Sequence, residues 1–154
     1  MSVLLSLIEV FCGGVCGVLA RYGVNLALHT TSTPFPLGIF FINLSGCFTL
    51  GFLSQRLAVS AINPATQQHI RLFLGTGVLG GFTTYSALIV DTNLLLANKH
   101  PLLALTYPIT SVGLGIVCAG LGVIAARATA KGSARRRREI PVTKHRVSGD
   151  GGAQ

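Results

Sequence analysis

The sequence predicts an all-α integral membrane protein with four transmembrane helices. Half of its 154 residues are hydrophobic and only 10% are charged, whereas about a quarter of a soluble domain is charged. The charged residues are also unevenly distributed, because nine of the sixteen lie in the last 26 positions. The first 128 residues therefore contain long apolar stretches, each able to cross a bilayer with about 20 helical residues.

Four spans separated by polar links can be drawn along the chain. They are expected at residues 4–28, 37–57, 72–96 and 102–126. The link between the second and third spans contains Asn63-Pro64 and several glutamines, and it is expected to be a loop. In the first span, Gly13, Gly14 and Gly17 form a small-x-x-x-small pattern that lets two helices approach closely.

The third span contains an unusually polar and glycine-rich stretch from Gly75 to Leu88, which reads GTGVLGGFTTYSAL. Paired glycines are poor helix formers, so the helix is expected to be broken near Gly80-Gly81. Broken backbone at membrane depth occurs only where it is buried in protein or lines a watery cavity. The stretch also fits the G-x-G-x-x-G pattern of dinucleotide sites, but it lacks the βαβ context which that pattern requires.

The charges predict the topology and the domain boundaries. Residues 1–128 are expected to form a four-helix membrane domain, and residues 129–154 a disordered basic cytoplasmic tail. With four spans, Arg56, Arg71, Arg127 and the basic tail all lie on one side, so both termini are expected in the cytoplasm. The run Arg135 to Arg138 follows a membrane span directly, which favours binding to anionic membrane lipid over nucleic acid.

Polar side chains inside the second and third spans are candidates for an ion pathway. Asn43 lies in the middle of its span, where its amide either bonds to a neighbouring helix or faces an anion path. The hydroxyls of Thr83, Thr84 and Ser86 can bond to their own helix. Beside a glycine break and Tyr85, however, three hydroxyls favour a lined path.

Two ionisable residues lie in the first span. Arg21 is the deepest cation, and such residues are functional candidates by default, although a position near a helix end also suits a topological anchor. Glu9 lies near the other end of the span. It is either a proton-coupling carboxylate or, more simply, a wetted acid near the membrane surface.

The motifs, in their order and spacing, resemble the CrcB/Fluc family of fluoride channels. The resemblance covers about residues 10–115 and rests on four segments. These are GGVCGVLARY (13–22), PLGIFFINLSG (36–46), GTGVLGGFTTYSAL (75–88), and Tyr107 with Ser111 in the last span. The resemblance implies an antiparallel dimer of four-span subunits, with two fluoride paths and dual topology in the cell membrane.

The resemblance also implies roles for individual residues. The backbone carbonyls of Gly80 and Thr83 would hold a structural Na⁺ at the dimer centre, and Arg21 would lie in a vestibule. The fluoride pathway would comprise Asn43, Thr84, Tyr85, Ser86, Leu88, Tyr107 and Ser111. Such a pathway suits fluoride, which needs strong hydrogen-bond donors to replace its water.

The chain departs from the family pattern at two ring positions. The family motif reads T-T-F-S-T-F, whereas Tyr85 and Leu88 occupy the phenylalanine positions here and Ala87 lies between them. The charge bias also disfavours insertion in both orientations. The hypothesis is therefore that the chain inserts in one orientation and pairs with a related subunit of opposite orientation, which supplies the missing phenylalanine. A dimer of the chain with itself stays open.

The sequence thus predicts a fluoride channel subunit, and no enzyme, that lowers cytoplasmic fluoride by passive efflux. One alternative is a proton-coupled exporter of the small multidrug type that uses Glu9. The other is a partner subunit of a heterodimeric fluoride channel that is not active alone. No nucleic-acid partner is expected.

Overall fold

The fold is described from a computed structural model that places residues 3–28 and 34–139, with side chains as far as residue 130. Every element in these ranges is helical. The elements are α1 (Val3–Leu28), α2 (Leu37–Ala58), α3 (Pro64–Ile70), the π-helix η1 (Arg71–Leu79), α4 (Gly80–Phe82), α5 (Tyr85–Ala97) and α6 (Pro101–Glu139). The third span comprises α3, η1, α4 and α5.

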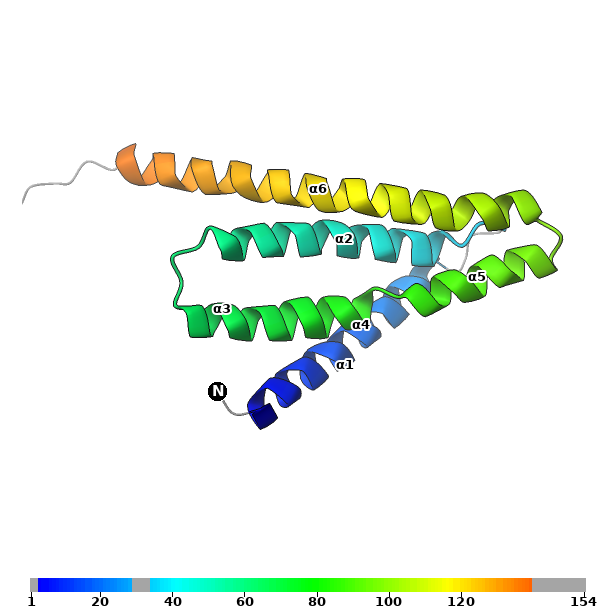
Figure 1. Cartoon of the computed structure of the whole chain (residues 1–154), viewed down its shortest axis with the longest axis horizontal. Helices are drawn as coiled ribbons and strands as arrows, with labels where there is room; N and C mark the ends of the chain where they lie inside the picture. Colours follow the sequence, from blue (N-terminus) through cyan, green and yellow to red (C-terminus); the bar gives the residue numbers. More distant parts are fainter. Residues whose placement is uncertain (1–2, 29–33, 140–154) are drawn as a thin grey trace, which may run out of the picture.

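Four helical stretches are long and apolar enough to cross a membrane, as the sequence predicts. The helices α2 and α6 run side by side (Figure 1). The helices α3 and α4 of the third span lie on the side of α2 that is opposite α6. The helix α1 crosses the third span and packs against η1 and α4, while α5 packs against α6. Large apolar side chains are exposed along all four stretches, as expected for surfaces that face lipid or another subunit.

The third span is interrupted at Thr83 and Thr84, where the backbone is extended (φ −77°, ψ 157° and φ −151°, ψ 126°). The position predicted for this break, Gly80-Gly81, is wrong, because Gly80 has helical angles (φ −65°, ψ −36°). The glycine at position 81 serves another purpose: a Cβ there would collide with the carbonyl oxygen of Gly14. The break falls at the threonines because Thr84 caps α5, its hydroxyl accepting a hydrogen bond from the Ala87 N–H at 3.2 Å.

A seam of glycines brings α1 against η1 and α4. A Cβ at Gly13 would collide with the carbonyl oxygen of Phe73, and one at Gly17 with that of Val78. A Cβ at Gly77 would meet the Gly13 Cα at 2.9 Å. The predicted close approach through the small residues of the first span is therefore confirmed, and it places α1 directly against the backbone of the third span.

Two segments are more helical than the sequence suggested. The expected loop after Asn63 contains α3, because Asn63 accepts a hydrogen bond from the Ala65 N–H at 2.9 Å and Pro64 opens the helix. The helix α6 continues to Glu139, so residues 129–139 of the expected disordered tail are helical here. Alanine and arginine, which are good helix formers, are frequent in this extension. The rest of the expected tail, residues 140–154, lies outside the described residues, and the boundary between domain and tail stays a prediction.

Candidate ion pathway at the break in the third span

Asn43 of α2 binds both backbone groups of Thr84 at the break. Its Nδ2 donates to the Thr84 carbonyl at 3.0 Å, and its Oδ1 accepts from the Thr84 N–H at 2.9 Å. Because a backbone N–H only donates and a carbonyl only accepts, this pair fixes which way the amide points. One Nδ2–H remains free for another acceptor. The structure therefore shows the interhelical hydrogen bond expected for Asn43 and still leaves it a donor.

The same pair changes the hydrogen bonding of Gly80. In a continuous helix, the Thr84 N–H would donate to the Gly80 carbonyl four residues earlier. Here that N–H is directed to Asn43, so the Gly80 carbonyl loses its helical partner. The neighbouring Thr83 carbonyl accepts from Arg21 Nη1 at 3.4 Å. The break therefore presents two main-chain oxygens outside the regular helical pattern.

A hollow of about 480 Å³, the central hollow, lies between α2, the third span and α6. Seven of the predicted site residues line it, namely Asn43, Gly80, Thr83, Thr84, Tyr85, Leu88 and Ser111. Ser111 is only 5% exposed, and its buried Oγ has no hydrogen-bond partner in the described part of the chain. Burying a hydroxyl without a hydrogen-bond partner costs free energy. The Ser111 hydroxyl is therefore available as a donor to an ion in the hollow.

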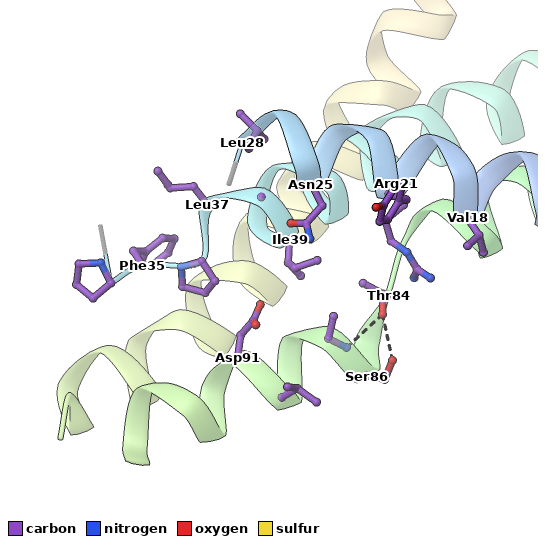
Figure 2. A pocket seen from close by; sticks show the side chains of 16 residues that line it. Val18, Arg21, Asn25, Leu28, Phe35, Leu37, Ile39, Thr84, Ser86 and Asp91 are labelled. Atoms are coloured by element: carbon purple, nitrogen blue, oxygen red, sulfur yellow. Dashed lines mark hydrogen bonds between the residues drawn. The ribbon is translucent and has the colours of Figure 1, made fainter. Parts of the chain in front are cut away.

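A second hollow of about 730 Å³, the vestibule, opens between the ends of α1, α2 and α5 (Figure 2). The predicted residues Arg21, Thr84 and Ser86 line it, and Figure 2 shows the Arg21 guanidinium beside Thr84 and Ser86. The hydroxyls of Thr84 and Ser86 are 3.2 Å apart. Thr84 lines both hollows, so the vestibule and the central hollow meet at the break.

The two ring positions of the motif face different surroundings. Tyr85 is 74% exposed, whereas Leu88 is 4% exposed and packs in a core cluster with Tyr107. Tyr107 is fully buried and lines neither hollow; its ring meets that of Phe35 edge-on, with 5.3 Å between the centroids. The structure therefore does not bring Tyr107 to the pathway with the other predicted residues.

Asp91 and Asn25 line the vestibule and were not predicted. Asp91 accepts a long hydrogen bond from the Tyr107 hydroxyl at 3.5 Å, so Tyr107 reaches the vestibule through this carboxylate. An acid inside a membrane span is itself a functional signal, and it could have identified Asp91. Asn25 carries no comparable signal in the sequence.

Comparison with known proteins identifies the family. Residues 8–123 match the family model described as "CrcB-like protein, Camphor Resistance (CrcB)". This chain belongs to the CrcB-like family. The matched region contains both hollows and the break, so the architecture described above is that of a CrcB-like protein.

Curated relatives of this CrcB-like chain are named fluoride-specific ion channel FluC. The protein of Paracoccus denitrificans is 42% identical over 90 residues, which are 58% of this chain and 68% of that protein. The protein of Granulibacter bethesdensis is 46% identical over 93 residues, or 60% and 71% of the two chains. FluC 2 of Leifsonia xyli is 44% identical over 91 residues, or 59% and 62%.

These findings establish the class of this CrcB-like protein. Its relatives are ion channels, which confirms that it is not an enzyme. With four helices able to span a bilayer, it is a multi-pass protein of the bacterial cell membrane. The predicted all-α fold with four helices able to span a membrane is likewise confirmed.

Proposed function

We propose that this chain is a subunit of a fluoride-selective channel that lets cytoplasmic fluoride leave the cell passively. The observation that carries the proposal is the pair of free donors at the break. The second Nδ2–H of Asn43 and the buried Ser111 hydroxyl both line the central hollow. The names of the relatives supply the ion, because each is called a fluoride-specific channel.

The proposed path begins at the vestibule and ends in the central hollow. Arg21 attracts an anion to the vestibule, where the Ser86 and Thr84 hydroxyls lead towards the break. Thr84 then connects to Asn43 and Ser111 in the central hollow. Fluoride is small and tightly hydrated, so a series of N–H and O–H donors is the chemistry that replaces its water.

The main-chain oxygens of Gly80 and Thr83 fit the proposed structural Na⁺. Gly80 and Thr83 both line the central hollow, and the Gly80 carbonyl lacks its helical donor because the Thr84 N–H donates to Asn43. Carbonyl oxygens are ligands that hard cations accept. A bound cation would make the electrostatic potential more favourable for anions nearby. This chain contributes these two residues and the hydrogen bonds by which Asn43 holds Thr84.

The proposed assembly is an antiparallel dimer, with itself or with a related subunit of opposite orientation. Tyr85 is 74% exposed and so is free to contact a partner, whereas Leu88 lies in the subunit's own hollow. The basic residues on one side of the membrane favour a single orientation in anionic lipid. We favour the related subunit, because Leu88 supplies no ring edge for the anion.

A second candidate function follows from the leucine at position 88. If a path needs a ring at position 88, this chain completes a partner's path and conducts little alone. The exporter that uses Glu9 is not favoured, because Glu9 lines neither hollow and contacts His69 instead.

Efflux from liposomes tests these functions. The chain is reconstituted alone and together with its related subunit, and release of fluoride, chloride and a cationic dye is measured. We expect fluoride release without dye transport, faster for the pair than for the lone chain. Glu9→Gln retains fluoride efflux under the channel proposal and abolishes transport under the exporter alternative. Absence of fluoride efflux from both preparations would refute the channel.

A further inference from the structure

Four residues at intervals of four lie on the face of α1 that packs against the third span. They are Glu9, Gly13, Gly17 and Arg21. In the same order they meet the His69 side chain and then the backbone oxygens of Phe73, Val78 and Thr83. A polar contact therefore stands at each end of the face, with two glycines between them.

We propose that Glu9 and His69 form a tie that holds α1 in register against the third span and thereby positions Arg21 at Thr83. The carboxylate Oε1 lies 2.5 Å from His69 Nδ1. Its other oxygen, Oε2, is buried without a partner in the described part of the chain. Glu9 and His69 are positioning residues in this proposal, and their effect on fluoride efflux rests on the function proposed above.

The contact between Glu9 and His69 is partly shielded from solvent, so it can contribute to the packing of α1. The side chains of Glu9 and His69 are 19% and 37% exposed, unlike an ion pair on an open surface. Exposed pairs contribute little, but removing one partner of a shielded pair leaves the other charge uncompensated. Because no described residue bonds to the second carboxylate oxygen of Glu9, the side chain depends on His69 in particular.

The glycine seam leaves little freedom between the two ends of the face. At Gly13 and Gly17 the two helices touch backbone to backbone, with no side chain between them to absorb a shift. A displacement at Glu9 is therefore passed along α1 to Arg21. Packed helices of this kind respond by discrete shifts rather than by continuous deformation.

The π-helix keeps the two ends in register. Glu9 and Arg21 are twelve residues apart, whereas their partners His69 and Thr83 are fourteen apart. The stretch between these partners contains η1, and the i→i+5 bonding of a π-helix takes one more residue per turn. The local widening of the third span thus lets contacts form at both ends of α1, and it gives the π-helix a structural purpose.

A distance measurement tests the tie without requiring conduction. Spin labels are attached at Leu5→Cys and Gln68→Cys in the full chain, with the four native cysteines replaced by alanine, in liposomes. We expect a narrow distance distribution for the parent chain and for His69→Lys, which keeps a cationic partner for the carboxylate, and a broader one for Glu9→Gln. The exposed Thr66→Ala serves as the control and should match the parent chain.

Fluoride efflux from the same variants then tests the positioning. We expect about threefold slower efflux for Glu9→Gln than for the parent chain, and parent-like efflux for His69→Lys. A distance distribution of Glu9→Gln that matches the parent would overturn the tie. A broader distance distribution with unchanged efflux would overturn its link to Arg21. A chain without any efflux would contradict the proposed function, while the distances would still decide the tie.

Discussion

Asn43 replaces one turn of helical hydrogen bonding for Thr84, 41 residues away. Its amide donates to the Thr84 carbonyl and accepts from the Thr84 N–H, at 3.0 and 2.9 Å. One side chain on α2 thereby satisfies the extended backbone of Thr84, withdraws the helical donor of the Gly80 carbonyl and lines the central hollow. The break and the pathway depend on the same residue.

Removing this amide is expected to damage both stability and conduction. Asn43→Ala leaves the N–H and carbonyl of Thr84 without their partners, at a cost of about 1–3 kcal/mol for each buried group. Asn43→Asp retains the acceptor but directs a carboxylate oxygen at the Thr84 carbonyl and adds negative charge to an anion path. We expect at least about tenfold slower fluoride efflux for both variants. Asn98→Ala, at the end of α5, is the matched control, and wild-type efflux from Asn43→Ala would contradict this role.

The substitution Ser111→Ala is expected to slow fluoride efflux without lowering the stability of the protein. Its Oγ has no partner in the described part of the chain, so Ser111→Ala removes a costly unsatisfied group. We predict a melting temperature in detergent equal to or above that of the wild type, together with at least about threefold slower fluoride efflux. Thr110→Ala, whose hydroxyl bonds to its own helix at 2.8 Å, is the control for the loss of an alcohol. A Ser111→Ala variant that conducts normally would show that the hydroxyl does not serve the ion.

The glycine seam predicts that alanine substitutions at two glycines of α1 differ in their effect on stability. Gly17→Ala places a methyl group against the Val78 carbonyl, and overpacking of this kind costs about 1–3 kcal/mol or more. The space beside the Gly14 Cα is open, so Gly14→Ala should change stability by at most about 0.5 kcal/mol. Thermal unfolding followed by circular dichroism measures both. Equal stability of the two variants would show that α1 does not pack as described.

The sequence predicted the spans and most of the residues around the break, because apolar length and in-span polarity are local signals. It misplaced the break, since the glycines at positions 80 and 81 read as helix breakers, whereas Gly81 permits close approach to α1. The extended residues are Thr83 and Thr84, and Asn43, the partner of Thr84, comes from another helix. Such pairings depend on packing, which no local pattern contains.

The same reasoning accounts for the other misses. The π-helix and the Glu9–His69 contact depend on how α1 meets the third span, so neither could be read from periodicity. Tyr107 was assigned to the pathway by resemblance alone, and the structure packs it against Leu88 and Phe35 instead. Asp91 was visible as an acid within a span, yet only the fold places it opposite Arg21 in the vestibule.

Leu88 offers the sharpest test of whether the chain conducts alone. It lines the central hollow and is 4% exposed, so Leu88→Phe directs a ring edge into the hollow at a modest packing cost of about 1–3 kcal/mol. If the path lacks a ring, this variant should release fluoride from liposomes at least about threefold faster than the lone wild-type chain. Adding the related subunit should then bring a smaller gain than it brings to the wild type.

Leu95→Phe is the matched control for this substitution. Leu95 is also 4% exposed and belongs to the same core cluster as Leu88, but it does not line the central hollow. It should lower the melting temperature as much as Leu88→Phe or more, because its ring has no hollow to enter, and it should bring no gain in efflux. Lone wild-type chain that conducts as fast as Leu88→Phe would show that leucine suffices at this position. The departure from the family motif would then carry no requirement for a second kind of subunit.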